Sequence, residues 1–200
     1  ISGDGQTIVS GAADQSIRWW DRTGNLIGQS QGNLGRVYAV ALHPNQPLIA
    51  SASGDKTVRL WDLQGNPVSP PFEGHQTEVY AIAFSPEGQL IASGGRDRTI
   101  RLWDLQGNPI GRPFEKHTDD INALAFSPDG QTLVSASRDG SLLLWDVDKE
   151  KVANRFEGHK GSANDVVLPK GDRWLIAATG THVSIYDFAS RRLEASLGPH

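Results

Sequence analysis

A six-residue motif that returns at a nearly constant spacing constrains this chain more than any other feature. The motif Thr57-Val-Arg-Leu-Trp-Asp62 recurs almost unchanged at 99–104, as variants at 16–21 and 141–146, and in a weaker form at 183–187. Its aromatic markers stand 41, 42, 42 and 41 positions apart, at Trp20, Trp61, Trp103, Trp145 and Tyr186. A fixed period of this length is the sequence signature of a repeat architecture. We therefore expect one structural unit to be repeated along the chain.

Each period divides into four short apolar stretches that are separated by turn signals. In the unit that ends at residue 114, the runs at 79–84 and 90–93 interleave apolar and small residues, as strands buried on both faces do. Pro86, Gly88 and Gly94 punctuate the turns. The third and fourth strands are expected at 99–103 and 110–114, and Gly111 and Pro113 restrict the fourth to a sheet edge. No stretch has the length and periodicity of a helix.

These patterns predict an all-β fold, a β-propeller of four-stranded antiparallel blades. Sheets that are apolar on both faces need a neighbour on each side, and radial stacking supplies one. We expect one propeller segment over 1–200: a partial blade at 1–30 without its first strand, blades at 31–72, 73–114 and 115–156, and a degenerate blade at 157–198. The second blade is expected to hold all four strands between residues 37 and 72.

Composition excludes several classes of function. Hydrophobic content of 38% and charged content of 21% are typical of a soluble, folded chain. A net charge of −4 and the lack of a Lys/Arg cluster argue against binding to nucleic acid. Without cysteine there are no disulfides or thiolate zinc sites, and no apolar run approaches the ~18 residues of a membrane span. We expect a cytoplasmic protein without cofactors and, since the chain lacks Met, a segment of a longer protein.

Four polar positions share the period of the repeat. His75, His117 and His159 each precede a Trp or Tyr marker by 27 or 28 residues, Asn33 holds this place in the second unit, and His200 falls in the same frame. A Ser ten residues and an Asp six residues before each Trp complete the sets, which are Ser10, Asp14 and Trp20; Ser51, Asp55 and Trp61; His75, Ser93, Asp97 and Trp103; His117, Ser135, Asp139 and Trp145. A catalytic triad occurs once, in one cleft, whereas this set recurs. We interpret it as a buried hydrogen-bond chain.

Gly-His, a gap of about 28 residues and Trp-Asp, with Ser-Pro-Asp-Gly and an Asp turn between them, resemble the WD-repeat (WD40) β-propeller family. The resemblance covers the whole chain and implies that the four polar positions form the family's structural tetrad. It also implies a ring of seven blades, of which about five are covered. The near-identical linkers at 63–67 and 105–109 are similar to those of bacterial repeat arrays.

The last unit departs most from the family pattern. Ala177 takes the Ser place, Tyr186 takes the Trp place, and the turn Thr179-Gly-Thr181 is one residue short and has no Asp. We expect polar partners to be left unsatisfied there, at a cost of ~1–3 kcal/mol each. This blade should therefore be the least stable of the complete ones.

The resemblance implies a non-catalytic scaffold that binds a protein or peptide on the face carrying the loop after strand four and the turn after strand two. Family contacts fall three and five residues after the His and one before the Asp. Here these positions are Arg36, Tyr38, Glu78, Tyr80, Arg96, Asp120, Asn122 and Arg138, together with Ser162, Asn164, Ala13, Gly54 and Thr179. Tyr and Arg are enriched in interface hot spots. The alternative is that they are ordinary solvated loop residues.

Other interpretations remain open at this stage. The chain is also consistent with a sensor or regulatory propeller of a larger bacterial signalling protein, beside an NTPase, kinase or protease-like domain. An enzyme would need acids, bases or ligands that break the repeat; Asp119 and Asp120 beside His117 lack a further metal anchor. Trp19 and Trp174 are expected in core or outer-strand packing. An open arc would expose two apolar blade faces, so we expect further blades in the intact protein or self-association through those faces.

Overall fold

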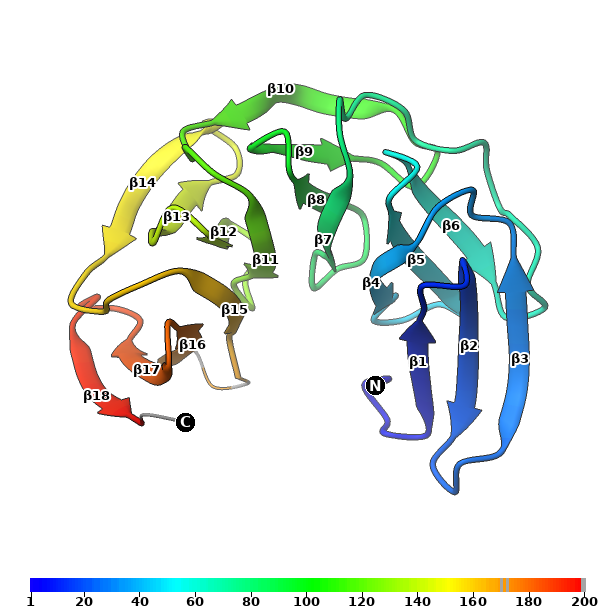
Figure 1. Cartoon of the computed structure of the whole chain (residues 1–200), viewed down its shortest axis with the longest axis horizontal. Coiled ribbons are helices and arrows are strands. Elements are labelled where there is room, and N and C mark those ends of the chain that lie inside the picture. Colours follow the sequence, from blue (N-terminus) through cyan, green and yellow to red (C-terminus); the bar gives the residue numbers. More distant parts are fainter. Residues whose placement is uncertain (170, 172, 199–200) are drawn as a thin grey trace.

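Five antiparallel sheets follow one another along the chain and are arranged as an open arc, shown in Figure 1. The computed structural model describes residues 1–169, 171 and 173–198, and contains no helix among them. The expected all-β class and the radial stacking of small sheets are confirmed, and the described sheets do not close into a ring. His200, which the repeat frame places at a His position, lies outside the described residues.

We call the five sheets the first to fifth blades, in chain order. The first two have three strands each: β1 (Thr7–Gly11), β2 (Ser16–Asp21) and β3 (Leu26–Gln31), then β4 (Val37–Leu42), β5 (Leu48–Ser53) and β6 (Val58–Asp62). The third blade has β7 (Val79–Phe84), β8 (Ile91–Gly95), β9 (Thr99–Trp103) and β10 (Pro109–Glu115). The fourth and fifth have β11 (Ile121–Phe126), β12 (Thr132–Ser137), β13 (Leu142–Asp146) and β14 (Lys151–Phe156), then β15 (Ala163–Val167), β16 (Trp174–Thr179), β17 (His182–Asp187) and β18 (Leu193–Leu197).

The predicted fourth strand of the second blade is wrong. Residues 66–72 run beside β6, but they pair with it only through isolated bridges at Pro67 and Phe72. Three prolines occur in this stretch, at 67, 70 and 71. Proline has no N–H to donate and is poorly tolerated within a ladder, so the chain leaves the sheet between the two bridges. In the third blade, by contrast, β10 tolerates Gly111 and Pro113 at the sheet edge, where the register shifts between Ile110 and Phe114.

The hydrophobic core lies between the blades, as expected for sheets that are apolar on both faces. Each of the four interfaces between successive blades holds one cluster of buried side chains. The aromatic marker of the later blade belongs to each cluster: Trp61, Trp103, Trp145 and Tyr186. Each of these four markers is at most 2% exposed. The repeated aromatic residue therefore packs its own blade against the preceding one.

Trp19 and Trp174, which lie outside the marker frame, pack in different ways. Trp19 is buried at the interface between the first two blades, in a cluster with Trp61. Gly28 faces it across β2 and β3, where a Cβ would lie only 2.1 Å from the indole nitrogen. Trp174 is half-buried, and the Arg173 guanidinium carbon lies 4.4 Å from the centroid of its ring. The expectation of core packing is thus confirmed for Trp19.

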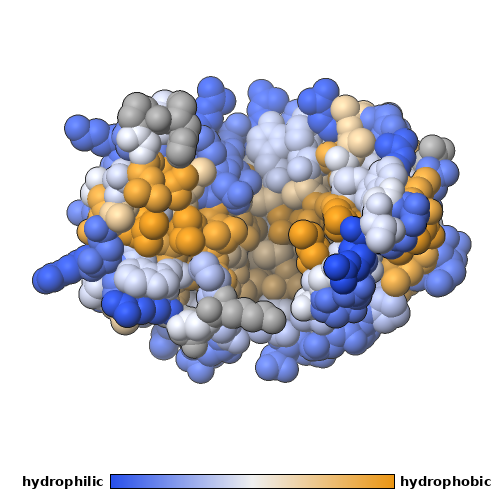
Figure 2. Space-filling view, turned by 90° about the horizontal axis from the view of Figure 1, so that it is seen from below, coloured by the Kyte–Doolittle hydropathy of each residue, from blue (hydrophilic) through white to orange (hydrophobic). Residues whose placement is uncertain are grey.

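The two ends of the arc expose apolar surface, and Figure 2 shows it on both sides of the hollow between them. On the first blade, Ile8, Trp20 and Leu26 form a cross-strand row, and Ile8 and Leu26 are exposed. On the fifth blade, Val167 and Leu197 are exposed. The marker Trp20 therefore has no preceding blade to pack against among the described residues.

Candidate functional site

The hydrogen-bond chain predicted from the polar repeat forms in the third and fourth blades. In the third, the Trp103 indole N–H donates to Ser93 Oγ at 2.8 Å, Ser93 Oγ lies 2.8 Å from His75 Nε2, and His75 Nδ1 lies 2.8 Å from Asp97 Oδ2. The fourth blade repeats these contacts at 2.8, 2.6 and 2.9 Å with Trp145, Ser135, His117 and Asp139. The chain ties three elements of each blade to the loop that carries the His.

The partners in this hydrogen-bond chain determine which His75 nitrogen carries the proton. Because ionised Asp97 only accepts, His75 Nδ1 carries the hydrogen and Nε2 accepts from the Ser93 hydroxyl. The arrangement is that of a Ser-His-Asp triad, yet Ser93 is fully buried and no substrate reaches its Oγ. Burial opposes ionisation of Asp97, but hydrogen bonds from His75 and from two backbone N–H groups outweigh it and lower the pKa of Asp97 to about 2.

The first and second blades carry incomplete versions of this hydrogen-bond chain. Trp20 donates to Ser10 at 3.1 Å and Trp61 to Ser51 at 2.9 Å. In the second blade, Ser51 donates to the Asn33 side chain at 3.2 Å, and Asn33 does not reach the Asp. An arginine four residues after each Asp binds it instead, since Arg18 bonds Asp14 at 2.8 Å and Arg59 bonds Asp55 at 3.3 Å.

In the fifth blade a shorter series of hydrogen bonds takes the place of the hydrogen-bond chain. The Tyr186 hydroxyl lies 2.6 Å from His159 Nδ1, while His159 Nε2 lies 2.8 Å from the carbonyl oxygen of Gly140 in the fourth blade. Burial raises the pKa of Tyr186 to about 12, so the hydroxyl keeps its proton and donates it. The expectation of unsatisfied partners is therefore wrong for His159. The order of blade stabilities stays a prediction.

The predicted partner-binding residues lie at one end of the inner strands, and β-bulges place several of them. The register of each inner strand shifts by one residue at the same point of the repeat. The extra residues are Tyr38, Tyr80, Asn122 and Asn164. A bulge leaves one residue without a partner and re-aims its side chain. Nothing in the sequence pattern marked these positions as bulges, although their common place after the His was visible.

Backbone hydrogen bonds bring the other predicted residues together in pairs. The N–H of Arg96 donates to the carbonyl of Glu78 at 3.0 Å, and that of Arg138 donates to the carbonyl of Asp120 at 2.9 Å. Their side chains then form ion pairs, with nitrogen–oxygen distances of 3.2 Å for Arg96 with Glu78 and 3.9 Å for Arg138 with Asp120. In the second blade the same backbone bond joins Gly54 to Arg36.

The arginines form the outer layer of this face. The side chains of Arg96 and Arg138 are 57% and 65% exposed, whereas those of Glu78 and Asp120 are 29% and 19% exposed. Exposed ion pairs contribute little to stability. The side chains are thus free to exchange these partners for others, and the charge presented outermost is positive.

A tyrosine pair joins the second and third blades at the same face. The rings of Tyr38 and Tyr80 meet edge to face with centroids 4.8 Å apart, and the guanidinium carbon of Arg36 lies 5.9 Å from the Tyr38 centroid. Tyr38 is 43% exposed. Partial burial, with the carboxylates of Glu78 and Asp120 nearby, raises the pKa of Tyr80. Five predicted residues therefore form one continuous patch, which we call the loop face: Arg36, Tyr38, Glu78, Tyr80 and Arg96.

The remaining predicted residues are less available. The Asn122 side chain donates to the carbonyl of Ala163 at 3.0 Å and so bridges the fourth and fifth blades. Thr179 is buried, and its hydroxyl lies 2.6 Å from that of Ser184. Asp120 and Arg138 continue the loop face toward the fourth blade. The Asp120 carboxylate lies near enough to Tyr80 for its charge to raise the pKa of the Tyr80 hydroxyl. Asn164 and Ala13 are exposed without side-chain partners among the described residues.

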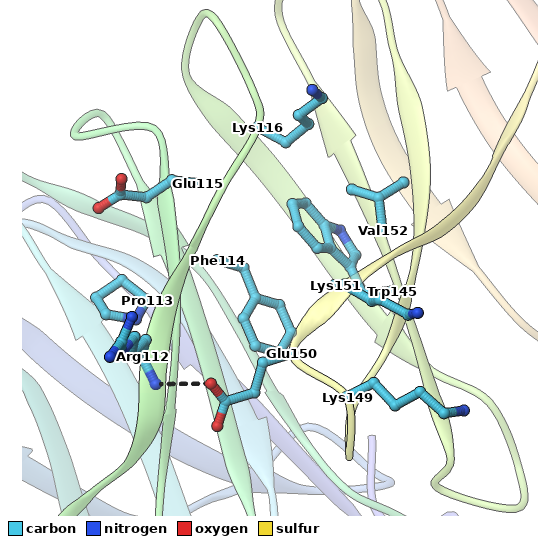
Figure 3. A pocket seen from close by; sticks show the side chains of 10 residues that line it. All are labelled: Arg112, Pro113, Phe114, Glu115, Lys116, Trp145, Lys149, Glu150, Lys151 and Val152. Carbon is cyan, nitrogen blue, oxygen red and sulfur yellow. Dashed lines mark hydrogen bonds between the residues drawn. The ribbon is translucent and has the colours of Figure 1, made fainter.

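A groove of about 570 Å³ lies elsewhere, on the outer rim between the third and fourth blades (Figure 3). Phe114 and Trp145 stack at its base, with centroids 5.2 Å apart. Glu150 reaches across from the hairpin between β13 and β14 and accepts a hydrogen bond from the Arg112 backbone N–H at 3.2 Å. Of the described residues that line this groove, none belongs to the predicted partner-binding set.

The described residues contain no candidate metal cluster and no candidate membrane-spanning helix. No group of three or more His, Cys, Asp or Glu side chains is placed to hold a metal ion there, and the pair Asp119 and Asp120 beside His117 does not form one. The same part of the chain has no helix of the length and apolarity that crossing a membrane requires.

Comparison with known proteins agrees with the geometry. The family model described as "WD domain, G-beta repeat" matches residues 1–21, 24–62, 65–104 and 107–146. The U5 small nuclear ribonucleoprotein 40 kDa protein of Pongo abelii is 40% identical over 52 residues, which is 26% of this chain and 15% of that protein. The match therefore spans a small part of that relative's length.

Proposed function

Since this chain belongs to the WD-repeat (WD40) family, whose repeats indicate a protein-interaction scaffold, we propose that it binds a protein or peptide segment through its loop face without catalysing a reaction. The observation that carries the proposal is the Tyr38–Tyr80 pair, which is partly exposed and bracketed by the guanidinium groups of Arg36 and Arg96. Aromatic and arginine side chains at the centre of a patch are the usual anchors of an interface.

The chemistry of the loop face defines the segment that would fit. An apolar or aromatic side chain would pack against the tyrosine rings, and flanking acidic groups would pair with Arg36, Arg96 and Arg138. The carboxylates of Glu78 and Asp120 lie deeper and are shared with arginine. A segment of mixed charge would therefore place its cations close to these carboxylates and its anions outermost.

A peptide-display selection tests this proposal. Random peptides selected on the 200-residue chain are titrated against the unchanged protein, Tyr80→Ala and a rim control, Val68→Ala; Val68 is 49% exposed and lies away from the loop face. Loss of a central anchor costs at least ~2 kcal/mol, or about thirtyfold in affinity. The proposal fails if the selected peptides bind Tyr80→Ala as tightly as the unchanged chain.

The wider setting of the chain is also a proposal. The similar relative is named as part of a ribonucleoprotein, and we propose that this chain likewise serves inside a larger assembly, in the cytoplasm, by contacting protein and not nucleic acid. The near-identical linkers at 63–67 and 105–109 favour a regulatory propeller of a bacterial signalling protein as the second candidate. The exposed apolar ends offer a third contact, self-association, which light scattering would detect as a dimer mass.

A further inference from the structure

The repeat allows one blade to be compared with the same place in its neighbours, and one such place differs in the fifth blade. In the second to fourth blades, the residue after the His position donates its backbone N–H to the tetrad Asp. The pairs are Leu34 to Asp55 at 3.0 Å, Gln76 to Asp97 at 2.9 Å and Thr118 to Asp139 at 2.9 Å. Each loop therefore presents a donor that a carboxylate satisfies.

In the fifth blade this donor belongs to Lys160, and the short turn opposite it has no Asp. Among the described residues, the Lys160 backbone N–H has no acceptor. The arginine that the first three blades carry opposite their Ser is missing as well, and the fourth blade has Leu143 in that position. Ser184 pairs across the sheet with Ala177, as Arg101 pairs with Ser93 in the third blade. The Asp of the other blades and the large side chain opposite their Ser, an Arg or a Leu, thus have no counterpart here.

A cavity of about 340 Å³ occupies this place, and we call it the fifth-blade pocket. Its lining includes His159, Lys160, Thr179, His182, Ser184 and Ser196, and no carboxylate lines it. Lys160 forms no ion pair among the described residues. His182 Nδ1 lies 3.1 Å from the Thr181 hydroxyl, which leaves Nε2 for another partner. In the described part of the chain, the unpartnered Lys160 backbone N–H and His182 Nε2 therefore belong to a pocket without an anion, and its lining residues Lys160 and Ser196 also carry an ammonium group and a hydroxyl.

We propose that the fifth-blade pocket binds an oxyanion, a carboxylate or phosphoryl group, in the place that the Asp carboxylate occupies in the other blades. The backbone N–H and the ammonium group of Lys160 are donors, and a negatively charged acceptor satisfies them better than water because charge-assisted hydrogen bonds are stronger. A cation would find no carboxylate among the lining residues. The site is separate from the loop face, so its test is independent of the proposed function.

Amide NMR on the whole 200-residue chain tests the proposal, with inorganic phosphate and acetate titrated separately at constant ionic strength. Saturable shifts confined to amides near 158–161 and 179–184 are expected, and the tighter of the two anions identifies a phosphoryl or a carboxylate site. Lys160→Ala should weaken binding about tenfold. The matched control is Lys116→Ala, which removes an exposed lysine that precedes His117 in the fourth blade and should change nothing.

A second variant introduces an Asp into the short turn, so that the protein itself supplies the missing carboxylate. Replacing Gly180-Thr181 with the turn Arg96-Asp97-Arg98 of the third blade should satisfy the Lys160 donor and abolish anion binding, while the amides of the other blades stay unshifted. Shifts that do not saturate, or an equal loss of binding in Lys116→Ala and Lys160→Ala, would overturn the proposal. So would full binding in the turn replacement.

Discussion

In both the third and the fifth blade, hydrogen bonds hold a His-bearing loop against the sheet, but the bonds differ. In the third blade, Ser93 relays between the Trp103 indole and His75. In the fifth, the Tyr186 hydroxyl contacts His159 directly at 2.6 Å, and Ala177 fills the place of the relay. Tyrosine brings its own hydroxyl to the ring, so the serine is no longer needed. The two substitutions make sense only together.

The comparison also separates two functions of the tetrad Asp. In the third blade, Asp97 holds the imidazole, and it holds the turn by accepting from the Thr99 backbone N–H and hydroxyl at 3.1 and 3.0 Å. In the fifth blade a shorter turn, with Gly180 at a φ of 58°, needs no such support. The loss of the Asp in the fifth blade thus accompanies a shorter turn, and the fifth-blade pocket lies beside that turn.

The largest effect is expected when the Asp is removed from a blade whose hydrogen-bond chain is complete. Asp97→Ala leaves His75 and two backbone N–H groups without their acceptor, and we expect the free energy of unfolding to fall by about 3 kcal/mol. Urea unfolding measures the change. Asp148→Ala is the control, because Asp148 is exposed and surface changes usually cost within ~0.5 kcal/mol. Equal losses in the two variants would contradict a special role for Asp97.

Acid should break the hydrogen-bond chain in the two blades that keep the tetrad Asp bonded to a His, the third and the fourth. The pKa values of Asp97 and Asp139 are lowered to about 2, against burial, by hydrogen bonds that include those from His75 and His117. A depressed pKa means that their stabilisation is complete above the unfolded value of 3.8 and is lost as pH falls toward 2. The Trp103 and Trp145 indole N–H signals should therefore broaden between pH 4 and 2. Indole signals of Trp103 and Trp145 that stay sharp down to pH 2 would contradict this assignment.

Exchanging the relay residue between the blades gives a smaller effect, and both directions should destabilise. Ser93→Ala removes the acceptor of the Trp103 indole, and Ala177→Ser buries a hydroxyl beside an imidazole that is already satisfied by Tyr186. We expect each change to cost ~1–2 kcal/mol in thermal or urea unfolding. A stabilised Ala177→Ser variant would show that His159 still accepts the older arrangement.

Much of this architecture was predictable because the repeat presents the same evidence several times. The strands, the tetrads of the third and fourth blades and the inter-blade packing of the aromatic markers all depend on side chains at fixed spacing. The outer strand of the second blade was not predictable from spacing, because three prolines at 67, 70 and 71 overrule the repeat. Local backbone chemistry prevailed there over the periodic pattern.

The candidate site was only partly predictable for a similar reason. Sequence positions identified Tyr38 and Tyr80, but their placement on bulges and their edge-to-face contact between two blades depend on register, which spacing does not reveal. Neither the Ser-to-Ala nor the Trp-to-Tyr substitution predicts the bond between His159 and Tyr186 by itself. A compensating pair becomes visible only when both side chains are placed in one structure.

The smallest expected effect concerns the turn that follows each Asp. Gln15, Lys56 and Arg98 hold φ values of 72°, 73° and 65°, whereas the fourth blade has Gly140 at 81° in this position. A side chain costs energy in this left-handed region and glycine does not. Arg98→Gly should therefore raise the free energy of unfolding by up to ~1 kcal/mol, and Gly140→Ala should lower it by about as much, with a Cβ only 3.1 Å from the Gly161 carbonyl oxygen. Paired urea titrations measure both. Opposite signs would show that the third and fourth blades share one strained turn, whereas a destabilised Arg98→Gly would mean that the arginine side chain contributes more than its backbone strain costs.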